Sequence, residues 1–350
     1  MINHTSDPDH GFPVVHQLLD AGAGYAPVTN LIAVGDPDVR QIAGQWWMYV
    51  GAAFTDGGGE PTGVNLFSAS LPPGEPLAAD SWSFTTGPDD PTQAVPLVEL
   101  PGPGHFDEWL HTPCRVVGTV PGQIGEVERL YYTGTAGEDP DPAKRRMAIG
   151  VLERVNGHWR RRDEPIIVGS PERACVLEPK AVHHDGRWRI WYQATDHEAG
   201  PGELPDCEIH YVESENGITD WTSPRVVFSS ADNWFDAAVT PVPGGFHMLA
   251  ARAPNMFGGV SGLPPQGLWS MTASRPSGER HDWTATPSLL LDADTGAPWF
   301  AGGIYGPCAV KGTTPEDRDH LHVFFTGSAP PDPDPYVLSI GRFEVALPQV

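Results

Sequence analysis

The sequence predicts an all-β fold in which five four-stranded antiparallel sheets close into a ring. Three observations predict it. A hairpin pattern recurs five times, turn-forming residues are abundant, with 40 glycines and 38 prolines among 350 residues, and a strand-like run missing from the last repeat stands before the first. Long repeats of this kind are typical of β-propellers, in which each repeat forms one blade, and we expect five blades.

Each repeat opens with a pair of strands. A short strand leads through a turn that contains glycine to a second strand rich in aromatic and β-branched residues, which is a hairpin pattern. The five hairpins are expected at 36–51, 112–134, 178–193, 236–250 and 306–327. The residues that lead the five blades are Asp36, Pro113, Glu178, Asp236 and Pro307.

A third strand and a fourth element complete each repeat. Third strands are expected at 64–68, 146–151, 208–212, 267–271 and 336–340. In four repeats a tryptophan then precedes an aliphatic run, but the fifth repeat lacks this run, and its equivalent lies at residues 13–19. We therefore expect residues 13–19 to pair into the last blade, which would close the ring and protect its sheet edges.

The same pattern makes one domain over residues 1–350 the expected organisation. An ordinary β-sandwich is the alternative, but sandwiches lack a long repeat. The many prolines argue against any long helix. No linker long enough to divide the chain is evident.

Charge and hydropathy exclude several classes of function. The formal net charge is -24, from 21 Lys plus Arg against 45 Asp plus Glu, so the cationic surface that nucleic-acid binding needs is absent. No apolar run is long enough to span a membrane, and no secretory signal is visible in the printed sequence. We expect a cytoplasmic protein without nucleic-acid or membrane partners, or a secreted one if a signal precedes this sequence; its oligomeric state is left open.

The four cysteines are predicted to be buried free thiols. They lie far apart and form no C-x-x-C pair, which excludes a zinc ribbon. Two disulfides are the alternative, and free thiols would agree with a reducing compartment. The cysteines are Cys114, Cys175, Cys207 and Cys308.

Three carboxylates are the candidate catalytic groups. The first strand of every blade lines the channel of a propeller, so Asp36, Glu178 and Asp236 should converge at one mouth although they are distant in sequence. Such a group suits acid–base chemistry, because burial near another carboxylate raises the pKa of an acid while a solvated carboxylate stays a base. The alternative for Asp36 is an ordinary Asp-Pro turn at a strand entrance.

Aromatic and polar residues near these strand starts are candidates for binding a small carbohydrate. For Arg252 a structural ion pair is the alternative to substrate binding. The substrate-binding candidates are Asp38, Trp109, His111, Cys114, Gln193, Arg252 and Tyr305.

The segment Gly35-Asp-Pro-Asp-Val39, followed by Gly44-Gln-Trp-Trp-Met-Tyr49, resembles the first blade of five-bladed glycosidases, chiefly glycoside hydrolase family 43 and its relatives. The resemblance implies an inverting, exo-acting hydrolase of arabinofuranosides, xylosides or a related small glycoside. It implies Asp36 as general base and Glu178 as general acid. The second-blade Asp that tunes the acid in that family follows a proline; here that position is Cys114, and Asp236 is the candidate replacement.

The resemblance also bears on cofactors. Family members often hold a channel calcium near a fifth-blade histidine, but His320 and His322 lie on the second strand of that blade. We therefore predict no cofactor and no metal, with calcium as the open alternative. Because of Cys114, two further functions stay open: a non-hydrolytic sugar or specialised-metabolite tailoring enzyme, and a glycan-binding propeller with an inactive site.

Overall fold

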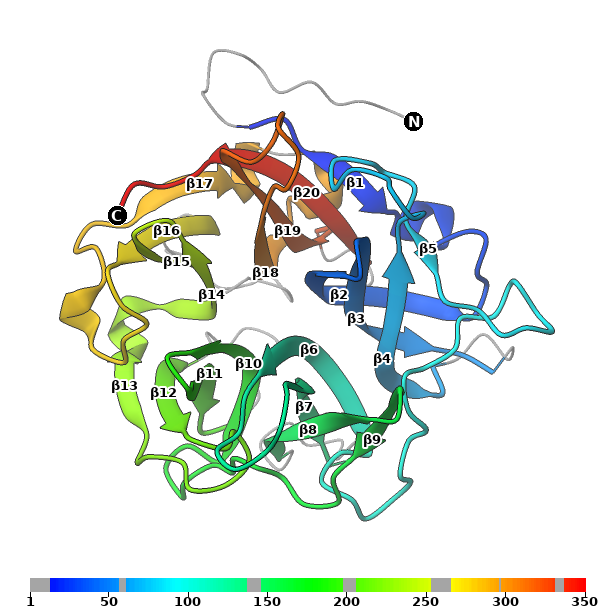
Figure 1. Ribbon diagram of the computed structural model, residues 1–350. Helices are drawn as coiled ribbons and strands as arrows, with labels where there is room; N and C mark the ends of the chain where they lie inside the picture. The colour runs from blue at the N-terminus through cyan, green and yellow to red at the C-terminus, as the bar shows by residue number, and fades with distance from the viewer. Residues whose placement is uncertain are drawn as a thin grey trace.

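In the part of the chain that the structure describes, twenty strands form five separate four-stranded antiparallel sheets, as predicted. The computed structural model describes residues 13–56, 61–136, 146–197, 206–252, 266–295, 297–330 and 337–350. Figure 1 shows the sheets as blades around a centre, with the first strand of each blade innermost. The helical segments in the described residues are all short 3-10 turns: Ala21–Ala23, Ser230–Asp232, Arg280–Asp282, Ala293–Thr295 and Pro298–Phe300.

The first three blades are continuous in sequence. Blade 1 consists of β2 (Leu31–Ile42), β3 (Gln45–Phe54), β4 (Gly63–Ser70) and β5 (Ser83–Phe84). Blade 2 consists of β6 (Trp109–Gly118), β7 (Val127–Thr135), β8 (Met147–Val155) and β9 (His158–Arg161). Blade 3 consists of β10 (Cys175–His184), β11 (Arg187–Thr195), β12 (Glu208–Ser214) and β13 (Arg225–Phe228).

The last two blades differ in how they end. Blade 4 consists of β14 (Trp234–Val242), β15 (Gly245–Arg252), β16 (Gly267–Ala273) and β17 (Ser288–Asp292). Blade 5 consists of β18 (Gly303–Lys311), β19 (His320–Ser328), β20 (Leu338–Ala346) and, from the other end of the chain, β1 (His16–Leu19). Strand β1 pairs antiparallel with β20, so the prediction that residues 13–19 complete the last blade is confirmed. Tyr336, which opens the third strand expected there, lies outside the described residues.

Each inner strand contains a β-bulge at the same place. Two residues of the inner strand interrupt its pairing with the second strand, at 36–37, 112–113, 178–179, 235–236 and 306–307. Proline, which has no N–H to donate, takes the second bulge position in all blades except the fourth. The first bulge residue has a positive φ in four blades: Asp36 56°, Thr112 51°, Glu178 56° and Gly306 56°.

These bulges correct the sequence analysis, which put the carboxylates at the beginnings of the inner strands. Strand β2 begins at Leu31, five residues before Asp36, and β10 begins at Cys175, before Glu178. Proline suggested a strand start, because it cannot donate to a sheet ladder. A bulge accommodates proline within the strand and turns the preceding side chain away from the regular alternation.

Aromatic side chains fill the spaces between blades. Trp188 is fully buried, stands edge-on to Tyr131 of blade 2 at 6.2 Å, and donates its indole N–H to the Thr119 carbonyl. Trp191 makes a similar contact with Trp283 of blade 4 at 6.3 Å. The hairpin tryptophans of blade 3 therefore serve packing between blades.

The four cysteines are free and buried, as predicted. No helix among the described residues is long and apolar enough to cross a membrane.

Candidate functional site

Three consecutive bulges bring Asp36, Thr112 and Glu178 together. Thr112 Oγ1 lies 3.1 Å from Asp36 Oδ2 and 2.9 Å from Glu178 Oε1. His111 Nδ1 lies 2.9 Å from the same hydroxyl and 3.8 Å from Glu178 Oε1. One ligand atom from each of Asp36, His111 and Glu178 lies within 4.8 Å of the others. Three of the predicted site residues, Asp36, His111 and Glu178, therefore form a cluster around Thr112, which was not among the predicted residues.

Side chains of the preceding blades hold the bulges in place. The Asp36 N–H donates to Thr326 Oγ1 at 2.7 Å, and the Glu178 N–H donates to Thr133 Oγ1 at 2.9 Å. Each threonine stands opposite the residue just before a bulge, on the second strand of its own blade. The position of both carboxylates is thus fixed by the backbone and by contacts across the blade interfaces.

The surroundings of Glu178 favour a protonated carboxyl. Burial, together with Asp36 and Asp236, raises the pKa of Glu178 well above its ordinary value. Its Oε2 is buried and has no hydrogen-bond partner among the described residues. The Asp36 side chain, by contrast, is partly exposed.

One arrangement of protons satisfies the Thr112 hydroxyl, which can donate one hydrogen bond and accept two. Thr112 Oγ1 lies within donating distance of both Asp36 Oδ2 and Glu178 Oε1, but its single hydrogen serves one of them at a time. When Glu178 is protonated, as its raised pKa favours, its O–H can donate to Thr112 Oγ1 while Thr112 donates to Asp36, an arrangement that suits an acid beside a base.

Asp236 belongs to the same electrostatic group but not to the same repeat position. It is the second residue of its bulge, where other blades carry proline, so its predicted place at the leading position is corrected to one residue later. Its carboxylate accepts from Gln193 Nε2 at 2.8 Å and from the Gly306 N–H at 2.6 Å. Burial raises the pKa of Asp236 to about 6, although both hydrogen bonds oppose the shift.

The next residues along the inner strands form a second group in the channel. Asp38 is buried, pairs with Arg40 at 2.7 Å and accepts the Arg115 N–H at 2.8 Å. Cys114 accepts the Ala181 N–H at 3.1 Å, and burial raises its pKa to about 11, so its thiol is neutral at neutral pH.

Cys114 therefore does not stand beside the two carboxylates in place of an acidic residue, which corrects the prediction for blade 2. The bulge turns Thr112 toward Asp36 and Glu178, and Cys114 follows two residues later in the strand. The group that contacts the acid from blade 2 is a hydroxyl.

Three further predicted binding residues lie on β6, β18 and β15. Trp109 is the first residue of β6, and its Nε1 lies beside Gly63 of blade 1. Tyr305 is buried and stands edge-on to Phe235 at 6.4 Å. Arg252 does not pair with the carboxylates: its guanidinium stacks on Trp234, 3.6 Å from the ring centroid, and donates to the Asp232 carbonyl.

Sequence reasoning missed Thr112 and gave no role to Lys180, although it expected Lys180 near the channel mouth beside Glu178. Thr112 precedes Pro113 as Asp36 precedes Pro37 and Glu178 precedes Pro179, so an X-Pro alignment of the blades would have found it. Lys180 follows Pro179 and is buried in the channel. A lone lysine in a strand is ordinarily a surface residue, and its burial depends on the ring of blades.

The donor set fits calcium poorly. Calcium takes six to eight oxygen ligands, whereas Asp36, His111 and Glu178 offer two carboxylates and a ring nitrogen. A metal ligand must also lose its proton, which the raised pKa of Glu178 opposes, and Lys180 adds positive charge nearby. Asp36, His111 and Glu178 therefore make a poor calcium site.

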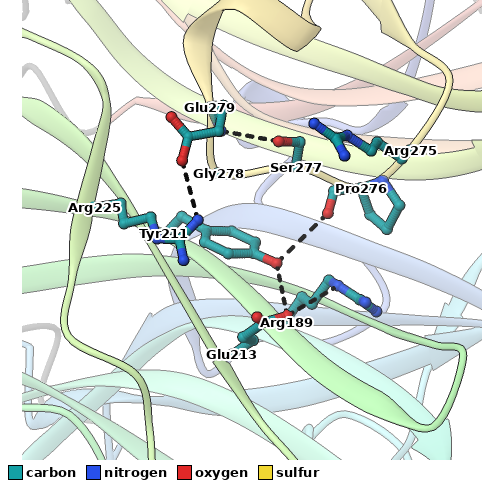
Figure 2. Close-up of a pocket in the computed structure, with 9 residues that line it drawn as sticks. All are labelled: Arg189, Tyr211, Glu213, Arg225, Arg275, Pro276, Ser277, Gly278 and Glu279. Atoms are coloured by element: carbon teal, nitrogen blue, oxygen red, sulfur yellow. Dashed lines mark hydrogen bonds and ion pairs between the residues drawn. The ribbon is translucent and has the colours of Figure 1, made fainter.

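A separate hollow of about 280 Å³ lies between blades 3 and 4 (Figure 2). Its arginines are engaged with acids: Arg225 pairs with Glu279 at 3.0 Å, and Arg189 lies 3.5 Å from Glu213. Tyr211 donates to Glu213 as well. None of the three carboxylates described above lines this hollow, and its charges already satisfy one another.

No protein-family profile and no curated protein sequence matches this chain. Solved structures with the same fold include five-bladed propeller glycoside hydrolases. An α-L-arabinofuranosidase from Podospora anserina, in complex with cellotriose, is 11% identical over 95% of this chain and 96% of that chain, with a TM-score of 0.58. A family 117 glycoside hydrolase from the marine bacterium Zobellia galactanivorans is 14% identical over 95% and 90%, with a TM-score of 0.60.

A xylan β-1,4-xylosidase from Bacillus halodurans C-125 is 14% identical over 93% of this chain and 55% of that chain, with a TM-score of 0.57. At such identities the likeness establishes the fold. The resemblance inferred from the first blade is thereby confirmed at the level of architecture.

Proposed function

We propose that the protein is a glycoside hydrolase in which Glu178 is the general acid and Asp36 the general base. The observation that carries the proposal is the approach of the two carboxyls over Thr112, with Glu178 buried and its pKa raised while Asp36 is partly exposed. One group can then give a proton to the leaving oxygen while the other activates a nucleophile.

Arabinofuranosides, xylosides and related small glycosides are the proposed substrates, cleaved from a chain end. The support is the shared fold with an arabinofuranosidase and a xylosidase. The stereochemical course stays a prediction. Inverting enzymes separate their carboxyl groups by about 6.5–9.5 Å and retaining enzymes by about 5–5.5 Å, and here the nearest oxygens lie within 4.8 Å. NMR of the first product anomer decides between inversion and retention.

The main test is hydrolysis of a panel of 4-nitrophenyl and natural glycosides by the wild type and by Glu178→Gln. The variant should lose at least ~10²-fold in turnover on natural substrates, because it cannot protonate the leaving group. Activated nitrophenyl substrates should recover much of that loss. Glu164→Gln, at an exposed position, is the matched control and should behave as the wild type; equal activity of both variants would end the proposal.

The second candidate is a non-hydrolytic sugar or metabolite tailoring enzyme. It is favoured by the hydroxyl of Thr112 and the neutral thiol of Cys114, which leave blade 2 without a carboxylate at the centre. A glycan-binding protein is distinguished from both enzymes by Asp36→Asn and Glu178→Gln, which should leave glycan binding intact in an enzyme while abolishing turnover.

A further inference from the structure

Lys180 is the cationic residue at the centre of the acidic cluster. It lies on β10, two residues after Glu178, at the position held by Asp38, Cys114 and Cys308 in blades 1, 2 and 5. The side chain is buried, with 4% of its surface exposed, and its Nζ has no hydrogen-bond partner among the described residues. The whole sequence contains three lysines, and one of them is buried at this site.

Titratable groups on all five inner strands interact with the Lys180 ammonium. Burial alone would lower the pKa of Lys180, but the neighbouring thiol and carboxylates outweigh burial and raise it. The groups that interact with Lys180 are Asp36 and Asp38 on β2, Cys114 on β6, Glu178 on β10, Asp236 on β14 and Cys308 on β18.

The other nearby cation is already engaged. Arg40 pairs directly with Asp38 at 2.7 Å and donates to the Arg115 carbonyl at 2.9 Å. Asp36, Glu178 and Asp236 form no ion pair with any arginine in the described parts of the chain. Besides the His111 ring, whose Nδ1 lies 3.8 Å from Glu178 Oε1, the cation among the described residues that acts on these three carboxyls is Lys180.

We propose that Lys180 is the internal counter-ion of the site, a positioning residue whose ammonium stabilises the surrounding carboxylates as a group and sets the pH range in which one carboxyl is protonated and another ionised. The inference rests on the proposed function for its catalytic consequence, but the charge of Lys180 can be measured without any substrate. The buried ammonium acts on all three carboxyls, and among the described residues it makes no direct hydrogen bond to any one of them.

The first experiment measures that charge in the unaltered protein. Protein labelled with ¹⁵N-lysine gives three Nζ signals, which Lys144→Arg and Lys311→Arg assign by removing one signal each. The Lys180 signal should stay in the ammonium range at pH values near 10.4, where ordinary lysines lose their proton. A Lys180 signal in the neutral-amine range at pH 8 would overturn the proposal, whatever reaction the protein catalyses.

The second experiment compares pH profiles of kcat/KM. In Lys180→Met both the acidic and the basic limb should move to higher pH by about one unit or more, because the carboxyls hold their protons more tightly without a neighbouring positive charge. Lys180→Arg should restore most of the wild-type profile. Lys311→Met, which removes the same charge from the exposed end of β18, is the matched control and should not shift either limb.

An unshifted profile in Lys180→Met, with the same folded circular dichroism spectrum as the control, would refute the role of Lys180 as counter-ion. If the wild type hydrolyses no glycoside, the proposed function fails while the lysine titration still supports or overturns the counter-ion. The two failures are therefore distinguishable.

Discussion

Thr112 shows how much this site depends on a single hydroxyl. A β-branched residue with φ 51° is strained, because its side chain crowds the backbone in that conformation. The strain brings Thr112 Oγ1 between Asp36 and Glu178. A small polar group at this bulge joins the acid and the base without adding a third negative charge.

Replacing Thr112 tests this link. Thr112→Val keeps the shape and the β-branch but removes the hydrogen bonds, so kcat/KM should fall about 10- to 100-fold, the equivalent of about 1.5–3 kcal/mol for bonds to charged groups. Thr112→Ser keeps the hydroxyl and should stay within a few-fold of the wild type. Equal rates for the valine variant and the wild type would show that the hydroxyl has no part in turnover.

Gly306 makes room for the base. Its φ is 56°, and a Cβ built on it would lie 2.6 Å from Asp36 Oδ1 and 3.0 Å from Thr326 Oγ1. Gly306→Ala should therefore displace the Asp36 carboxylate and lower kcat/KM at least ~10-fold, in addition to the backbone cost of about 1 kcal/mol. Gly24→Ala is the control: Gly24 has a φ of 63° with no atom within 4 Å of the added Cβ.

The control should lose stability in thermal unfolding and keep its rate. A Gly306→Ala variant with wild-type kcat/KM would mean that Asp36 does not need its present position.

At this scale the sequence predicted part of the site. Asp36 and Glu178 were predicted because acid residues before proline recur in the repeat, and they do lie together. The offset of Asp236 was missed because a bulge shifts the side-chain alternation by one residue and leaves no mark in the hydrophobic pattern. Asp38 accepts the Arg115 N–H of the next blade, and Arg252 stacks on Trp234 of the neighbouring strand, contacts that depend on the folded chain.

Strand β1 is the element on which closure of the ring depends. It pairs with β20, and Leu19 at its end packs into a core shared by blades 5 and 1, with Ile340 and Val34 among its members. A strand contributed from the opposite end of the chain ties the two terminal blades together, so opening it exposes an edge of the last sheet.

Truncating Leu19 should therefore destabilise the whole protein. Leu19→Ala leaves a cavity in a fully packed core and should cost about 2–5 kcal/mol in urea unfolding, with a single transition. Val14→Ala, at a side chain that is 50% exposed, should change stability by less than about 0.5 kcal/mol. Two separate transitions, or equal effects of the two variants, would contradict a closing role for β1.

The elements themselves were largely predictable. Hairpins with glycine turns and aromatic second strands identified the blades, and the displaced aliphatic run identified β1. The bulges were not predictable from periodicity, because an X-Pro step reads equally as a strand entrance or as an interruption within a strand. In the structure the four X-Pro steps, and the Phe235–Asp236 step of blade 4, lie at the same register inside the inner strands. They are therefore interruptions within strands.

The whole molecule carries buried acids within a chain of net charge -24. For Asp236 the folded pKa of about 6 exceeds the ordinary value of 3.8, so the folded state binds a proton that the unfolded state releases between these pH values. Stability from this residue is then highest below pH 4 and falls as the pH rises through 6, by about 3 kcal/mol for a shift of roughly two units.

Asp236→Asn should lose this dependence. Its free energy of unfolding should fall less between pH 4 and 7 than that of the wild type, as measured by urea titration at each pH. Asp89→Asn, at an exposed acid, should follow the wild type, which separates the buried carboxyl from the general effect of negative charge. A slope for Asp236→Asn identical to that of Asp89→Asn would show that Asp236 takes up no proton on folding.

Because the five bulges lie at the same register, their first residues form an array of five corresponding side-chain positions that protein engineering could use. The left-handed backbone conformation recurs at four of these positions, and threonines of neighbouring blades anchor two of them, Asp36 and Glu178. A histidine or carboxylate introduced at Thr112 would add a new functional group on an unchanged backbone, whereas Gly306 has no room for a side chain. In chain order the array holds Asp36, Thr112, Glu178, Phe235 and Gly306.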